Sequence, residues 1–109
     1  MAITTRRKHA HPKTAMLAVD YPRQNETIAS ANYSVRVFAP EGVKRVGISI
    51  DQGPWKSCRP AVGYWWYDWS GYENGEHQIV VSMEASEGLR VISEPHEFFV
   101  ELSDKPVTP

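Results

Sequence analysis

The sequence predicts an all-β protein, an antiparallel β-sandwich of about seven strands. Short segments alternate apolar with polar side chains, and turn-forming residues separate them at spacings of roughly 8 to 12 residues. No segment repeats its apolar residues at the helical spacing of about 3.6. With 109 residues, the chain is long enough for one hydrophobic core and too short for two. We therefore expect a single folded domain.

Two strands are predicted in the first part of the chain. Residues 15–20 form the first, at a sheet edge, and Tyr21-Pro22 ends it because a residue before proline favours extended backbone. After a polar loop at 23–27, residues 31–39 alternate again, with one aromatic residue, Phe38, on the polar side. The core face of this second strand is predicted to carry Tyr33, Val35, Val37 and Ala39.

The clearest predicted hairpin lies between residues 46 and 58. Its first strand alternates Val46, Ile48 and Ile50 with Gly47, Ser49 and Asp51. The sequence of residues 51–54, Asp-Gln-Gly-Pro, then favours a turn, because Asp can bond to its own backbone, Gly tolerates a positive φ and Pro cannot donate to a ladder. Residues 55–58 return as a short strand, and we expect Cys58 to be a small apolar residue beneath the hairpin.

All four tryptophans lie between Trp55 and Trp69. Residues 64–69 form a strand that alternates Trp65, Tyr67 and Trp69 with Tyr64, Trp66 and Asp68. Because a carboxylate is costly to bury without a partner, we expect the face that carries Asp68 to be the outer one. The other face is therefore predicted to point toward the core.

Three further strands are predicted at 77–83, 89–93 and 96–102. The core-facing residues of the first and last are His77, Ile79, Val81, Met83, His96, Phe98, Val100 and Leu102. The sandwich is expected to span residues 15–103. Residues 1–14, which are basic, and residues 104–109 have little to bury, so we expect both to be flexible tails.

Charge and composition exclude several classes of partner. The chain has 12 Lys and Arg residues against 13 Asp and Glu residues, so no bulk field attracts nucleic acid or an anionic membrane. No run approaches the roughly 20 apolar residues of a membrane helix, and the N-terminus lacks the apolar segment of a secretory signal. The single cysteine cannot form an internal disulfide. We expect a cytoplasmic protein with no nucleic-acid or membrane partner.

Several segments together resemble the bacterial immunoglobulin-like, early-set β-sandwich domains that are appended to enzymes and surface proteins. The matching segments are 21–28, 33–37, 46–55, 65–69, 75–81 and Gly88. The resemblance covers residues 20–102. It implies a sandwich of two sheets that serves as a spacer, a dimerisation surface or a docking module, with no catalytic residues to carry over.

Catalytic and metal-binding arrangements are weakly indicated. Ser70, His77 and Asp68 have the residue types of an acyl-transfer triad, and Cys58 is a nucleophile that a histidine could activate, but no nucleophile-elbow motif accompanies either. A metal site at His77 and His96 lacks an acidic ligand at a suitable spacing. We therefore expect no enzymatic activity, no cofactor and no metal.

The aromatic residues are the best functional lead. Our leading hypothesis is a non-enzymatic module that binds a protein partner, or a second copy of itself, through a sheet face or an unpaired edge. The alternative is a carbohydrate-binding module whose platform is formed by Tyr64, Trp66 and Trp55. The same rings could instead fill the core, and for Trp66 the two placements are evenly balanced. The candidate binding residues are Trp55, Tyr64, Trp66 and Asp68.

Overall fold

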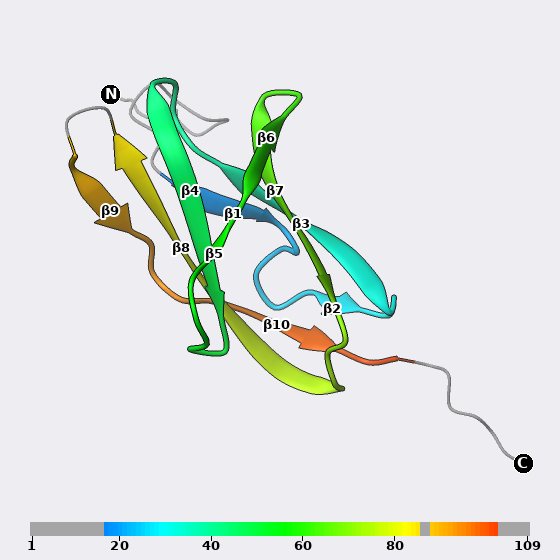
Figure 1. Cartoon of the computed structure of the whole chain (residues 1–109). Coiled ribbons are helices and arrows are strands. Elements are labelled where there is room, and N and C mark those ends of the chain that lie inside the picture. Colours follow the sequence, from blue (N-terminus) through cyan, green and yellow to red (C-terminus); the bar gives the residue numbers. More distant parts are fainter. Residues whose placement is uncertain (1–16, 86–87, 103–109) are drawn as a thin grey trace, which may run out of the picture.

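The computed structural model describes residues 17–85 and 88–102, and these residues form two β-sheets packed face to face (Figure 1). The described residues contain ten strands and no helix. The strands are β1 (Ala18–Tyr21), β2 (Thr27–Ile28), β3 (Asn32–Phe38), β4 (Val43–Ile50), β5 (Lys56–Ser57), β6 (Arg59–Ala61), β7 (Tyr64–Ser70), β8 (Gly75–Ala85), β9 (Arg90–Ile92) and β10 (His96–Val100). The predicted immunoglobulin-like β-sandwich is confirmed. In this part of the chain no helix is long and apolar enough to cross a membrane.

The strands divide into a first sheet with the order β1-β3-β7-β6 and a second sheet with the order β2-β10-β8-β4-β5. Strand β9 pairs with β8 in the second sheet. All pairings are antiparallel except that of β2 with β10. Only Cys58 separates β5 from β6, so the chain crosses from the second sheet to the first at this residue (Figure 1). This crossing closes part of one side of the sandwich.

The core lies between the two sheets, and the register of β3 with β7 shows which residues enter it. Val35 lies opposite Tyr67 and Val37 opposite Trp65, and both valines are fully buried. Because directly opposite residues share a face of a sheet, Trp65, Tyr67 and Trp69 point toward the core, as predicted. The largest fully buried side chains are those of Phe98, Ile48, Ile79, Val35, Val37, Val81 and Pro22.

Two short strands were not predicted. β2 has only two residues, and β6 includes Pro60, which as a sequence signal indicates a break. Proline is tolerated in β6 because this strand lies at the edge of the first sheet, where an N–H group is not required on the outer side. The predicted strands at 46–51 and 77–83 also begin earlier than predicted, at Val43 and Gly75.

The hairpin between β4 and β5 is confirmed, but its turn chemistry differs from the prediction. The positive φ angles belong to Asp51 (53°) and Gln52 (62°), whereas Gly53 donates its N–H to the Ile50 carbonyl at 2.9 Å. Two central residues with positive φ define a type I′ turn, whose twist matches that of the strands. The Asp51 carboxylate accepts a hydrogen bond from the Gln78 N–H at 2.9 Å instead of one from its own loop.

Cys58 is buried in the core at the sheet crossing, close to the predicted position beneath the hairpin. Burial raises the pKa of its thiol to about 12. Its N–H donates to the Val46 carbonyl at 2.9 Å, which holds the crossing strand against β4. The predicted tails at 1–14 and 104–109 lie outside the described residues, and the predicted domain limits of 15–103 stay a prediction.

Candidate functional site

Strand β7 carries three of the four candidate binding residues, and part of it is unpaired on one side. β3 pairs with β7 from Trp65 to Ser70, whereas β6 pairs with it only from Tyr64 to Trp66. Within the described chain, residues 67–70 therefore have a neighbouring strand on one side only. Backbone N–H and C=O groups of a strand point alternately to its two sides, so this stretch presents unpaired groups outward. We call residues 67–70 the free edge of β7.

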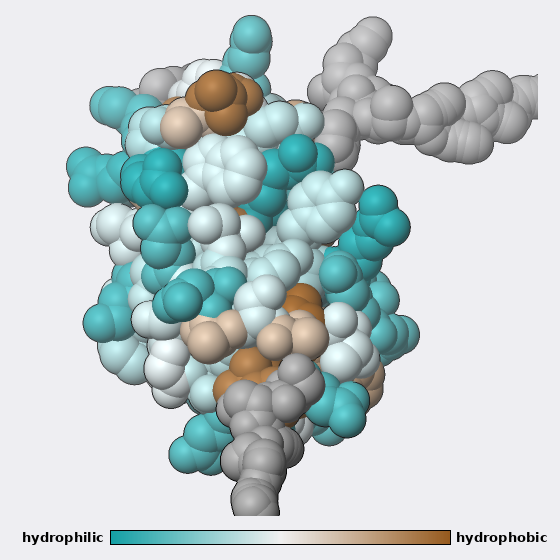
Figure 2. Space-filling model, turned by 90° about the vertical axis from the view of Figure 1, so that its right-hand side faces the viewer, coloured by the Kyte–Doolittle hydropathy of each residue, from teal (hydrophilic) through white to brown (hydrophobic). Residues whose placement is uncertain are grey.

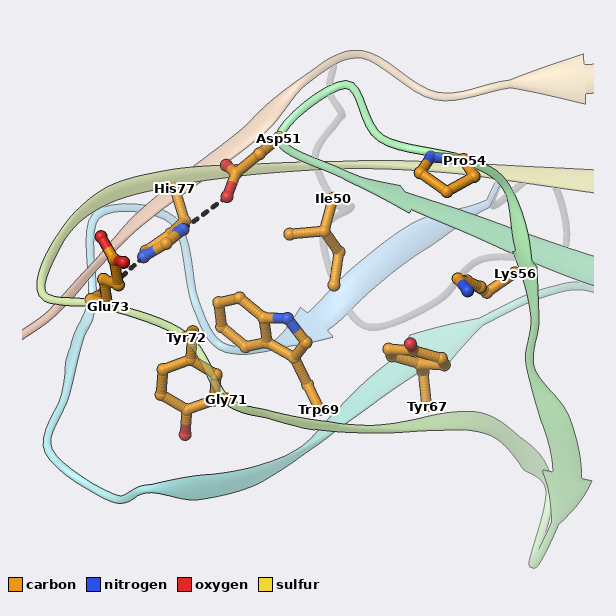
Figure 3. A pocket seen from close by; sticks show the side chains of 10 residues that line it. All are labelled: Ile50, Asp51, Pro54, Lys56, Tyr67, Trp69, Gly71, Tyr72, Glu73 and His77. Carbon is orange, nitrogen blue, oxygen red and sulfur yellow. Dashed lines mark hydrogen bonds and ion pairs between the residues drawn. The ribbon is translucent and has the colours of Figure 1, made fainter.

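A cavity of about 430 Å³ adjoins the free edge, between the β4–β5 hairpin and the end of β7 (Figure 3). We call it the β7 cavity. In Figure 3 the side chains of Ile50 and Trp69 point toward each other across it. The cavity is lined by Ile50, Asp51, Pro54, Lys56, Tyr67, Trp69, Gly71, Tyr72, Glu73 and His77.

Aromatic contacts fix the wall of the β7 cavity. The Trp69 ring is stacked on Tyr72 with a centroid distance of 3.9 Å, and it meets His77 and Phe98 edge-on at 5.1 and 5.5 Å. The Tyr72 hydroxyl donates to the Ser30 carbonyl, which anchors this ring in turn. These contacts hold the wall in place before any ligand arrives. Binding of a ligand against the wall therefore costs little side-chain entropy.

The polar end of the β7 cavity is an ion pair that the sequence did not reveal. His77 Nδ1 lies 2.6 Å from Asp51 Oδ2, and its Nε2 lies 2.7 Å from the Glu73 carbonyl oxygen. Both partners are acceptors, so a doubly protonated imidazolium satisfies them both. Burial disfavours the charged ring, but the hydrogen bonds that the ring donates to the Glu73 carbonyl and the Asp51 carboxylate outweigh it and raise the pKa of His77 above its usual value.

Tyr64, Trp66 and Asp68 lie on the outer face of the first sheet, since the residues that alternate with them point into the core. The Trp66 indole N–H donates to the Ala61 carbonyl at 2.9 Å, which holds this ring in place on that face. The rings of Tyr64 and Trp66 meet edge-on, at 6.3 Å and 75°, and Arg36 lies over Tyr64 at 4.0 Å. They do not form a coplanar platform.

Asp68 is held by polar partners on both neighbouring strands. The Ser34 hydroxyl donates to it at 3.0 Å and the Arg59 guanidinium at 3.2 Å. These two hydrogen bonds lower the pKa of Asp68 below its usual value, with Ser34 as the larger cause. The carboxylate therefore links β3, β7 and β6 across the outer face of the first sheet.

Trp55 lies on the opposite side of the molecule. It is 44% exposed, and a Cβ placed on Gly47 would lie 3.5 Å from its ring, so the ring rests against the outer face of β4 in the second sheet. Gly47 faces outward because Val46 and Ile48 on either side of it are buried. The predicted platform of Trp55, Tyr64 and Trp66 is therefore not assembled, since its members belong to two different outer faces.

The structure does not assemble the catalytic and metal sites considered from the sequence. Asp68 and His77 lie on opposite sides of β7, because Asp68 is on the outer face and His77 contacts the core-facing Trp69. His96 binds the Pro22 carbonyl at 2.6 Å and does not share a partner with His77. In residues 17–85 and 88–102, no group of three His, Cys, Asp or Glu residues is placed to hold a metal ion.

The distribution of hydrophobic residues on the outer surface also bears on how a partner can bind. Figure 2 shows a face that is mostly hydrophilic, on which hydrophobic residues form small, separate patches. Large contiguous apolar patches usually mark flat docking surfaces. That face therefore offers no large flat apolar docking surface.

Comparison with known proteins yields structural neighbours only. No family model and no curated protein sequence matches this chain. Its structure is similar to the fibronectin(III)-like modules of CbhA from Clostridium thermocellum, with a TM-score of 0.64 and 16% identity over 80% of this chain and 46% of that chain. It is also similar to CopC from Methylosinus trichosporium OB3b, with a TM-score of 0.66 and 18% identity over 84% of this chain and 98% of that chain.

A third neighbour is a modular endo-β-1,4-mannanase from Cellulomonas fimi, with a TM-score of 0.62 and 18% identity over 79% of this chain and 18% of that chain. At these identities the likenesses define the fold class, a fibronectin(III)-like or immunoglobulin-like sandwich. This chain spans less than half of the CbhA modules and a small part of the mannanase.

Proposed function

We propose that this chain is a non-enzymatic immunoglobulin-like module that binds a protein partner by accepting an extended segment along the free edge of β7. One observation carries the proposal: the free edge adjoins a cavity of about 430 Å³ with a rigid aromatic wall. In strand addition, main-chain hydrogen bonds supply affinity and pockets for alternate side chains supply specificity. Both elements are available at residues 67–70.

The register of such a complex follows from the geometry of β7. Side chains of the incoming segment that lie opposite Tyr67 and Trp69 share their face and enter the cavity. Side chains opposite Asp68 and Ser70 lie on the outer face. The preferred partner is therefore an extended segment with aromatic or aliphatic residues at alternate positions. A second copy of this chain can meet the requirement by antiparallel pairing of β7 with β7.

Two observations favour binding over catalysis in this region. Both ring nitrogens of His77 are already engaged, so the ring is not free to act as a base. Neither Cys58 nor Ser70 lines the β7 cavity beside His77.

The separation of Trp55 from Tyr64 and Trp66 removes the support for the three-ring carbohydrate platform. We therefore do not propose a second function for the first sheet.

Nuclear magnetic resonance with peptides selected from a random-sequence display library tests the proposal. Isotope-labelled protein is titrated with the selected peptides, and sedimentation at high concentration measures self-association in parallel. We expect the largest shifts at the amides of residues 67–70, together with cross-strand contacts between the peptide and this edge. Selected peptides that bind elsewhere, or a library that yields no binder for a strictly monomeric protein, overturn the proposal.

A matched pair of variants separates the cavity from the outer face. Tyr67→Lys places a charge beside the inserted side chain, whereas Tyr64→Lys makes the same change on the other face of the same strand. We expect Tyr67→Lys to weaken peptide binding by tenfold or more, since burying an unpaired charge costs at least about 1.4 kcal/mol. Tyr64→Lys should bind as the unmodified protein does. Urea unfolding shows that both variants are folded.

A further inference from the structure

One end of the free edge of β7 is closed by the chain itself. β6 begins at Arg59, opposite Trp66, so a segment that runs along residues 67–70 meets Arg59 in line with it. The chain reaches Arg59 from the second sheet, because Cys58 crosses between the sheets immediately before it. An added strand therefore cannot continue past Tyr67 in the plane of the sheet. It has to end there or turn away.

Pro60 shows which backbone groups of the free edge are open. It lies opposite Trp65, and a proline in an edge strand turns its nitrogen to the side that has no partner. The residues on either side of Pro60 therefore direct their N–H and C=O groups toward β7, where they meet the two residues that flank Trp65. These groups alternate along a strand, so those of Asp68 and Ser70 point to the same side. An added segment makes its main-chain hydrogen bonds with these two residues.

A lysine lies at the closed end of the free edge. Lys56 of β5 lies opposite Ile48, which is fully buried, so its side chain is on the inner face of the second sheet. In Figure 3 it lies on the side of the β7 cavity where Tyr67 lies. In residues 17–85 and 88–102 no carboxylate is in ion-pair contact with Lys56. A ligand can therefore supply the counter-charge.

The carboxylates on the outer faces of the two sheets near Lys56 are already engaged. Asp68, on the first sheet, is paired with Arg59 at 3.2 Å. Glu84, which lines a cavity on the outer face of the second sheet together with Lys56, is paired with Arg45 at 3.4 Å. Neither carboxylate neutralises the lysine, and Arg59 does not compete with it for an anion.

The opposite end of the β7 cavity is acidic on balance. Asp51 and Glu73 line that end, and the imidazolium of His77 lies between them (Figure 3). Two carboxylates thus face one cation there, whereas Lys56 stands at the end near Tyr67. A peptide that brings a negative charge is attracted to the closed end and repelled from the other. The charges therefore fix the direction in which an acidic chain end is added.

We infer that the free edge of β7 binds the C-terminal segment of a partner protein, with the terminal α-carboxylate at Lys56. The inference rests on the proposed strand addition and names the kind of segment that is added. The segment runs antiparallel to β7, with its last residue opposite Tyr67 and the residue two before it opposite Trp69. These two side chains enter the β7 cavity, so both are apolar.

A chain end satisfies both features of the closed edge. It does not have to pass Arg59, which an internal segment does unless it turns away. Its carboxylate gives the lysine a charge-assisted hydrogen bond, the stronger kind of polar contact. An inward-pointing lysine also opposes addition of segments that bring only apolar side chains, because its charge is then covered without a partner. Lys56 therefore selects chain ends and disfavours unspecific association.

Three synthetic peptides with one core sequence test the inference by titration of isotope-labelled protein. The first ends in a free carboxylate, with valine last and phenylalanine two residues before it. The second is the same peptide with a C-terminal amide, and the third carries two further glycines, which move the carboxylate past the closed end. We expect the first to bind at least about tenfold more tightly than either of the others, the usual value of one charge-assisted contact. Added salt should reduce the difference.

Two lysine variants locate the carboxylate. Lys56→Gln should weaken the first peptide by about tenfold and leave the amide unchanged, so that the two bind alike. Lys44→Gln removes a lysine of β4 that does not line the β7 cavity, and it should preserve the difference. Urea unfolding shows that both variants are folded.

The outcomes separate this inference from the proposed function. Equal binding of the acid and the amide at residues 67–70, equal binding of the extended peptide, or a difference that persists in Lys56→Gln overturns the inference and leaves strand addition standing. If none of the three peptides shifts the amides of residues 67–70, the inference is also overturned, and the selected peptides described above decide strand addition separately.

Discussion

The ion pair of Asp51 with His77 gives a prediction that can be worked through from the structure. Replacing Asp51 by Ala removes the acceptor of His77 Nδ1 and the acceptor of the Gln78 N–H, and it places Ala at a φ of 53°. Replacing it by Asn keeps a residue that tolerates this backbone and keeps an oxygen for Gln78. Comparing the two variants therefore separates the effect of losing the charge on stability from the effect of straining the turn.

The size of the effect follows from the lost interactions. A hydrogen bond to a charged group contributes about 1.5 to 3 kcal/mol, and the lower end applies because Asp51 is 46% exposed. The bond from Gln78 adds about 0.5 kcal/mol or more. Left-handed backbone costs an ordinary residue such as Ala about 1 kcal/mol. We expect Asp51→Ala to lower the free energy of unfolding by about 3 kcal/mol and Asp51→Asn by about 1 kcal/mol near pH 6.

The pH dependence has a definite sign. The pKa of His77 is raised in the folded state, so its contribution to stability is fully present below the unfolded pKa of about 6.5 and is lost as pH rises through the folded pKa. Unmodified protein should therefore lose more stability between about pH 6 and pH 8 than Asp51→Asn. Cys58, whose pKa is also raised, destabilises the fold at alkaline pH in both proteins and cancels in the comparison.

Urea unfolding at the two pH values measures both quantities. Gln52→Ala is the control, because Gln52 occupies the same turn with a φ of 62° and has no side-chain hydrogen bond to the described residues. It should leave stability almost unchanged at both pH values, because Gln and Ala pay about the same cost for a left-handed backbone. Equal pH dependence in unmodified protein and Asp51→Asn would refute the assigned ion pair.

Three further predictions concern the core and the outer face. Cys58 should react with a thiol reagent at neutral pH only after unfolding, since burial raises its pKa to about 12, and rapid labelling of native protein would contradict its placement. Trp66→Phe should cost about 1 kcal/mol by removing the bond to the Ala61 carbonyl, as urea unfolding will show; an unchanged midpoint argues against that bond. Trp69→Ala should cost about 3 to 5 kcal/mol and remove its ring-current shift from the His77 resonances; a loss below 1 kcal/mol contradicts a packed cavity wall.

Alternation in the sequence was sufficient to assign the faces of the strands. The cost of burying the Asp68 carboxylate was enough to predict which face of β7 points outward. The register of β7 with β3 confirms this orientation. The same reasoning placed Ile48 and Val81 in the core. These predictions succeed because period-2 alternation depends on the local backbone alone.

The parts of the site that the sequence did not predict depend on long-range pairing. Asp51 meets His77 because Ile50 pairs with Ile79 across β4 and β8, and no local signal reports that register. The free edge of β7 likewise depends on where β6 begins, at Arg59 opposite Trp66. Trp55 belongs to the other sheet because the hairpin folds its ring onto Gly47, which appears in the sequence only as a small residue on the polar side of a strand.

The edges of the two sheets differ in how they are protected, and this difference bears on the proposed function. β1 has a register shift between Val19 and Tyr21, β2 and β5 have two residues each, and β6 is three residues long and includes Pro60. Short strands, bulges and proline are the usual means by which proteins prevent strand addition. The free edge of β7 has neither a bulge nor a proline, and it is exposed because β6 begins only at Arg59, opposite Trp66. Residues 32–35 of β3 are also open on one side, but of these two stretches it is the free edge of β7 that adjoins the cavity lined by Trp69 and Tyr72, and the proposed strand addition is placed there for that reason.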